Sequence, residues 1–103
     1  MDTTITAAPI GSLRQRMLQD MKLRGLGAHT QQDYIRHVRS FAAFLGRPPD
    51  TASAEDLRRF QLDQHRRAVG PATINAAVSA LRFLFTMTLK RPEIVLGLSV
   101  IRC

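Results

Sequence analysis

Residues 71–85, PATINAAVSALRFLF, constrain the fold of this chain more than any other segment. Gly70 and Pro71 mark the beginning of a helix, which we expect to extend to about Lys90, before Pro92. Apolar side chains occupy most of its circumference, so other helices must pack on two of its sides. The segment is therefore predicted to be the central helix of an all-α domain. Its two apolar rows are Ile74, Val78, Leu81 and Phe85, and Ala76, Ala80, Phe83 and Met87.

Three further helices are predicted upstream, because apolar residues recur at intervals of three and four between Gly and Pro signals. They are expected to run from Ser12, as N-cap, to Gly25, from near Thr30 to Gly46, and from Ser53, in a capping box with Asp56, to Gly70. Their expected core residues are Leu13, Met17, Leu18 and Met21, then Tyr34, Ile35, Val38, Phe41, Ala42 and Leu45, and then Leu57 and Phe60.

The chain of 103 residues is long enough for one compact core and too short for two ordinary domains. We expect a flexible segment over 1–11, a helical domain over 12–92 and a truncated linker or tail over 93–103. The final stretch, EIVLGLSVIRC, is rich in aliphatic residues. It folds back on the bundle, ends raggedly or continues into a linker, because such a segment is costly to leave in water.

The cellular location is predicted from what the ends of the chain carry. Cys103 is the single cysteine, which excludes an internal disulfide and fits a reducing compartment. The first eleven residues have no basic region followed by a long apolar stretch, so they do not form a secretory signal. No run of residues is apolar enough to span a bilayer. The expectation is a cytoplasmic protein without a membrane partner.

The net charge of +7 predicts an anionic partner. Thirteen of the 15 basic residues are arginines, whose planar guanidinium groups suit phosphate. A coding bias toward arginine combined with a need for solubility accounts for the same composition. Charge alone does not choose between DNA, RNA and a membrane surface.

One polar row follows the central helix through Asn75, Ser79, Arg82 and Thr86, spaced four, three and four apart. Such residues are ordinary occupants of a solvent-facing strip. They are also suited to DNA, because Asn and Arg pair with base edges while Ser and Thr reach phosphates.

A second polar face is predicted on the helix that begins near Thr30. Gln32, Arg36, Arg39 and Ser40 are spaced to lie together on the side opposite its apolar stripe. Thr30 and the free N–H groups of the first turn are suited to a phosphate. A solvated helix face explains the same pattern, but two such faces on two helices favour a binding surface.

Catalysis has little support in the sequence. His29, His37 and His65 are scattered over different segments, and no cluster of ligands has metal-binding spacing. Tyr34 is the only tyrosine and falls in an apolar stripe, which favours a core role over a nucleophilic one. We therefore expect no cofactor, no metal and no small-molecule substrate. A small all-α enzyme would need a pocket of convergent titratable groups, which the sequence does not indicate.

Two motifs together resemble a known family. Thr30, Tyr34, Val38, Arg39, Phe41 and Phe44 form the run T-x-x-x-Y-x-x-x-V-R-x-F-x-x-F, and residues 72–85 contain A-T-I-N followed by S-A-L-R-x-x-F. These runs resemble the second and fourth helices of the core-binding domain of tyrosine recombinases, the phage-integrase and Xer-like family. The likeness covers about residues 12–92, and RGLG before Thr30 and SAEDLRRF occupy corresponding places.

The resemblance implies a four-helix, SAM-like domain that forms half of a clamp around duplex DNA, with other recombinase protomers as further partners. Family members often have basic residues where this chain has Ala76 and Ala77. Their nucleophilic tyrosine lies in a separate C-terminal domain, so this chain is expected not to be an enzyme. The DNA-binding residues implied by position are Thr30, Arg36 and Arg39, and Thr73, Asn75, Ser79 and Arg82.

A different class of function is a protein-interaction module. SAM-like bundles also self-associate, and Phe83, Met87 and the aliphatic tail are candidates for a partner surface. An apolar interface tolerates salt that abolishes phosphate binding, so salt dependence separates the two hypotheses.

Overall fold

The structure is a computed structural model that describes residues 9–98. Within these residues it contains four α-helices, three short helical segments and no strand, which confirms the all-α prediction. The expectations for residues 1–8 and for Cys103 fall outside the described residues. The helices are α1 (Pro9–Leu23), α2 (Ala28–Leu45), α3 (Ala54–Arg66) and α4 (Pro71–Phe83), and the short segments are η1 (Pro49–Thr51), η2 (Leu84–Thr88) and η3 (Pro92–Val95).

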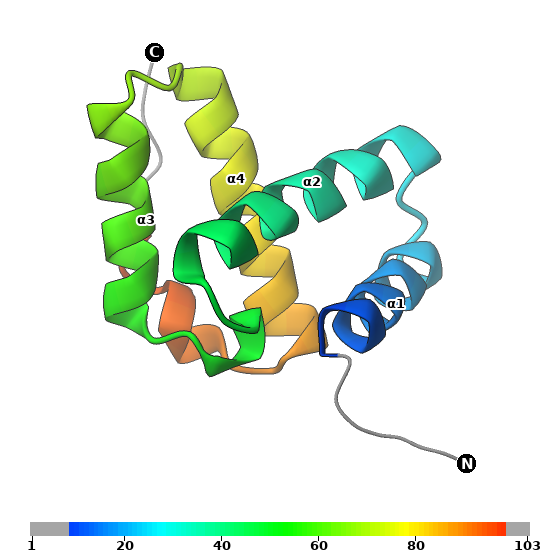
Figure 1. The fold of residues 1–103 in the computed structure, drawn as a ribbon. Coiled ribbons are helices and arrows are strands. Elements are labelled where there is room, and N and C mark those ends of the chain that lie inside the picture. The colour runs from blue at the N-terminus through cyan, green and yellow to red at the C-terminus, as the bar shows by residue number, and fades with distance from the viewer. Residues whose placement is uncertain (1–8, 99–103) are drawn as a thin grey trace.

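The core forms where α2 crosses α4, and this is the most extensive contact between any two elements (Figure 1). The ring of Phe41 lies 5.2 Å from that of Phe60 and 6.4 Å from that of Phe85, so three helical segments meet at one aromatic cluster. α1 packs on α2 and η2, while α3 packs on α2 and η3. Edge-to-face ring pairs of this kind add to the burial of apolar area.

The predicted apolar rows are largely confirmed. Ile74, Val78, Leu81 and Phe85 are buried, whereas Met87, from the second row, is 37% exposed. Leu57 and Phe60 are the buried apolar residues of α3, as expected, and Ser53 and Asp56 form the predicted capping box. The helix preceding Gly46 ends there because this glycine adopts the left-handed conformation that closes the helix.

The predicted start of the first helix was wrong. α1 begins at Pro9, three residues before the expected N-cap Ser12, which instead lies inside the helix. Proline is well suited to a first helical turn because its fixed φ matches the helix and its missing N–H has no partner there. The capping pattern at Ser12 was therefore outweighed by a better start signal upstream.

The last predicted helix also differs from expectation. Regular α-helical hydrogen bonding ends at Phe83, and η2 continues as a π-helix in which the N–H of Leu89 donates to the carbonyl of Leu84 at 2.8 Å. This wider turn allows Leu84, Phe85 and Thr88 all to be buried. Periodicity at 3.6 residues does not predict such an insertion.

The apolar stretch after Pro92 folds back on the bundle as far as it is described. Ile94, Val95 and Leu98 are buried in the common core, and η3 lies against α3 and η2. Leu96 is 83% exposed. Of the described aliphatic residues that the interaction-module hypothesis assigned to this stretch, all but Leu96 are therefore used by the domain itself.

Candidate nucleic-acid interface

The polar face predicted on α2 is exposed. Gln32, Arg36, Arg39 and Ser40 all lie at the surface. The Arg36 guanidinium is ion-paired with Asp33, and the hydrogen bond between them lowers the pKa of that carboxyl. The Arg39 guanidinium has no ion pair or hydrogen bond with another described residue. Arg39 is therefore the cation of this row that is available to an outside anion.

Thr30 does not belong to the exposed row of α2. It is half-buried in the first turn and precedes Tyr34 by four residues, which places it on the same side of the helix. Tyr34 packs on Phe83 of α4, with ring centroids 6.0 Å apart. Thr30 therefore faces the angle between α2 and α4, and not the outward side that carries Arg39.

The polar row predicted on α4 is also on the surface. Ser79 and Arg82 are exposed, while Asn75 and Thr86 are half-buried. The Thr86 hydroxyl donates to the backbone carbonyl of Arg82, so it is already used within the helix. The Arg82 guanidinium has no ion pair or hydrogen bond with another described residue, and it is the single cation of this row.

Thr73 lies apart from that row. It precedes the buried Ala77 by four residues and so shares the side of α4 on which α2 packs, but it lies in the exposed first turn. Leu84 lies seven residues after Ala77, which places the two on the same side of the helix. Leu84 lines a hollow together with Ile35 of α2, so this side of α4 faces α2. Thr30 and Thr73 therefore face the same angle between the two helices.

The two exposed rows point away from each other. On α2, Tyr34 packs on Phe83 of α4 and Phe41 packs on Phe85 of η2, both on the side opposite Arg39. On α4 the side that faces α2 carries buried Ala77, and Arg82 lies on the opposite side. Figure 1 shows the crossing that separates them. The structure thus divides the predicted site residues into an outward α2 face and an outward α4 face.

Three of the four arginines in α3 and at its C-cap have ion pairs, as the sequence indicated, whereas exposed Arg66 has none with another described residue. Arg58 and Arg59 pair with Glu55 at 3.2 and 3.4 Å, and Arg67 pairs with Asp63 at 2.8 Å. Exposed pairs of this kind contribute little stability, but they reduce the field that an approaching anion meets. Within α3, Arg66 is therefore the arginine that is available to an outside anion.

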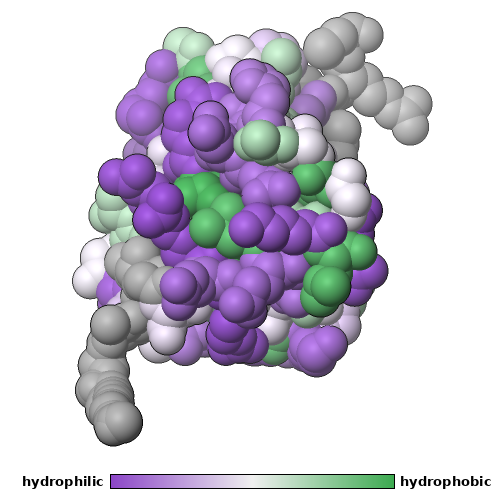
Figure 2. All heavy atoms as spheres, turned by 90° about the vertical axis from the view of Figure 1, so that its right-hand side faces the viewer, coloured by the Kyte–Doolittle hydropathy of each residue, from purple (hydrophilic) through white to green (hydrophobic). Residues whose placement is uncertain are grey.

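α1 adds a cation that the sequence did not assign to any contact. Arg14 is exposed, lacks an ion pair with any described residue, and lines a shallow hollow together with Arg39. The side of the molecule that carries α1 and the beginning of α2 is largely hydrophilic, with smaller apolar patches between the polar groups (Figure 2). The amphipathic pattern of α1 places Arg14 at the edge of its buried stripe, but only the packing of α1 on α2 brings it to Arg39.

Two features of other classes of protein are absent from the described residues. No group of His, Cys, Asp and Glu among them is arranged to hold a metal ion. None of the described helices is long and apolar enough to cross a membrane. His37, which the sequence left unassigned, is buried in α2, and burial lowers its pKa despite the nearby Asp33 carboxylate.

Comparison with known proteins identifies relatives of this chain. Residues 13–94 match the family described as "Phage integrase, N-terminal SAM-like domain". The chain is also 41% identical over 80 residues to the protein named "Putative integrase/recombinase y4qK" of Sinorhizobium fredii (strain NBRC 101917 / NGR234). That alignment covers 77% of this chain and 26% of the relative, so the chain spans about a quarter of the relative's length. No solved structure matches the chain.

Proposed function

Since the chain belongs to the family of phage-integrase N-terminal SAM-like domains, we propose that it binds duplex DNA as part of a site-specific recombination or integration reaction. Contacts from α2 and α4 hold the duplex. The cutting and rejoining of DNA belong to the whole recombinase, of which this domain supplies the positioning part. Other recombinase protomers on the same DNA are the second partner that we propose.

The observation that carries this proposal is the outward α2 face with its unpaired cation. Arg39 is exposed and has no counterion among the described residues, within a chain whose net charge is +7. Phosphate contacts dominate the affinity of such domains, and exposed arginines supply them. Arg36 adds a second guanidinium once DNA competes with Asp33 for it.

The contribution of α4 is proposed at two places. Thr73, in the exposed first turn, faces the same angle as Thr30 and is proposed to reach a phosphate there, on a different side of α2 from Arg39. Asn75, Ser79 and Arg82 form a separate surface on the outward side of α4. A straight duplex does not contact both outward faces at once, so the α4 face serves a bent duplex or a second DNA segment.

Three charge-matched variants test this division. Arg39→Gln and Arg82→Gln each remove one exposed, unpaired guanidinium, while Arg67→Gln removes one that is paired with Asp63. Binding of each variant to a fluorescent 20-base-pair duplex is measured by anisotropy over a range of salt concentrations. The wild-type log affinity should fall with log salt at a slope of roughly −3 to −4 if about four phosphates are contacted.

The expected order of effects follows from the proposal. Arg39→Gln weakens binding and reduces the salt slope by about 1, Arg82→Gln has the smaller effect on a short straight duplex, and Arg67→Gln binds nearly as the wild type does. Absence of wild-type binding at low salt would overturn the proposed function. Equal affinities for all three variants would overturn the assignment of the α2 face.

A further inference from the structure

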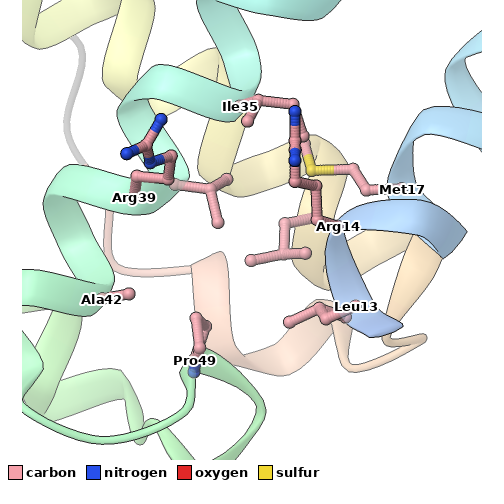
Figure 3. Close-up of a pocket in the computed structure, with 9 residues that line it drawn as sticks. Leu13, Arg14, Met17, Ile35, Arg39, Ala42 and Pro49 are labelled. Carbon is pink, nitrogen blue, oxygen red and sulfur yellow. The ribbon is translucent and has the colours of Figure 1, made fainter. Parts of the chain in front are cut away.

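Arg14 and Arg39 lie on two different helices but line the same hollow between α1 and α2 (Figure 3). The hollow is small and opens to solvent. In Figure 3 the two arginine side chains reach toward the same side of it. Their neighbours in the hollow are apolar without exception: Leu13, Met17, Ile35, Val38, Ala42, Pro49 and Leu84.

No carboxylate lines this hollow, and neither guanidinium has an ion pair or hydrogen bond with another described residue. This contrasts with α3, where Arg58, Arg59 and Arg67 are each paired within the helix. Both guanidinium groups are exposed, so solvent screens the repulsion between them. Neither has a counterion among the described residues, so an oxyanion with two acceptor oxygens finds donors available on both.

We propose that Arg14 and Arg39 form a two-helix clamp for one phosphodiester group of the DNA backbone. This inference rests on the proposed function and adds to it a contact from α1. Each guanidinium offers a planar fork of N–H donors, and a phosphodiester has two free oxygens to accept from them. The apolar floor keeps competing acceptors away, and the arginine stems cover it.

The clamp has a structural consequence for the binding surface. α1 is fixed to the rest of the domain by its buried side chains Leu13, Met17 and Met21. Arg16 adds a hydrogen bond of 2.9 Å to the Thr88 carbonyl of η2. The Arg14 backbone is therefore held in a defined position before DNA arrives, which lowers the entropic cost of ordering the clamp. The outward α2 face thus extends across the hollow onto α1.

The test uses single and double variants of the full chain in the same anisotropy assay. Arg14→Gln and Arg39→Gln are each expected to weaken duplex binding roughly tenfold and to reduce the salt slope by about 1. Because both side chains hold one phosphate, the double variant should lose less affinity than the two single losses multiplied together, which would be roughly hundredfold. Arg14→Lys keeps the charge but lacks the fork, so it should lose affinity with little change in slope.

Arg58→Gln is the matched control, because it removes one exposed arginine charge that is already paired with Glu55. Thermal unfolding of every variant confirms that the fold is intact. If Arg14→Gln binds like Arg58→Gln while the wild type binds DNA, the clamp is overturned and the proposed function stands. If the loss of affinity in the double variant equals the product of the two single losses, the proposal that both arginines hold one phosphate is also overturned. If the wild type itself fails to bind, the proposed function fails first.

Discussion

The Thr88 hydroxyl donates a hydrogen bond of 2.8 Å to a carboxylate oxygen of Asp20, joining η2 to α1 across 68 residues of sequence. Thr88 is 2% exposed, and its carbonyl accepts the hydrogen bond from Arg16, one turn before Asp20. Two residues of α1 therefore hold one residue of the π-helix. This contact therefore helps to hold α1, and with it Arg14, against η2.

Thr88→Val should destabilise the domain by about 1.5 to 3 kcal/mol, because it leaves a partly buried carboxylate without its donor. Urea denaturation followed by circular dichroism measures the change. The control is Thr51→Val, which removes an exposed hydroxyl bonded only to the nearby Pro48 carbonyl and should cost less than about 1 kcal/mol. Equal losses for the two variants would mean that the contact with Asp20 does not anchor α1.

Alanine substitutions at two neighbouring positions of α4 should differ strongly in their effect on stability. Leu81 is 1% exposed, so Leu81→Ala should cost about 2 to 5 kcal/mol of unfolding free energy. Arg82 is exposed, so Arg82→Ala should stay within about 0.5 kcal/mol of the wild type. Chemical denaturation of both variants provides the comparison, and loss of the fold in the Arg82 variant would show that its role is structural.

Stability should fall as the pH drops below the unfolded pKa of His37. Burial lowers the pKa of His37 in the folded protein from its ordinary value of 6.5, although the Asp33 carboxylate opposes the change. The unfolded chain then binds more protons than the folded one below about pH 6.5, so protonation favours unfolding.

Denaturant midpoints measured between pH 7.5 and pH 5 check this dependence. His37→Gln should reduce the dependence of stability on pH in that range, whatever its effect on stability at pH 7.5. His65→Gln is the control, because this histidine is exposed on α3. An unchanged slope in the His37 variant would contradict the assignment.

Asp56 should supply part of the acid sensitivity of the domain. The backbone N–H of Ser53, followed by its hydroxyl and by Arg47, lowers the pKa of Asp56 in the folded protein. This stabilisation is present above the unfolded pKa and is lost as the pH falls through the lower folded value. Asp56→Asn should therefore flatten the loss of stability between about pH 5 and pH 2. Glu55→Gln, one residue earlier, is the control. Its stability should fall more steeply between about pH 5 and pH 2 than the stability of Asp56→Asn does.

The helices were predictable from sequence because their signals are local. The capping box at Ser53, the left-handed Gly46 and the proline at position 71 each act within one turn, and the structure confirms them. The π-helix at Leu84–Thr88 was not predictable in this way. Thr88 within it makes two hydrogen bonds to α1, and a periodic pattern does not contain such tertiary contacts.

The candidate site was predictable only in part for the same reason. Helical spacing identifies which residues share a face of one helix, and so it grouped Arg36 with Arg39 and Ser79 with Arg82. It does not say how two faces are oriented once the helices cross. The separation of Arg39 from Arg82, and the meeting of Arg39 with Arg14, follow from packing between helices.

The most direct test of DNA binding is an NMR titration of the isotope-labelled protein with a 20-base-pair duplex at low salt, repeated at high salt. The account predicts salt-sensitive shifts in α2, in the first turn of α4 and at the side-chain Nε–H signals of Arg14 and Arg39, with one common dissociation constant. Absence of shifts at millimolar DNA, or shifts that persist unchanged at high salt, would contradict a phosphate-binding surface.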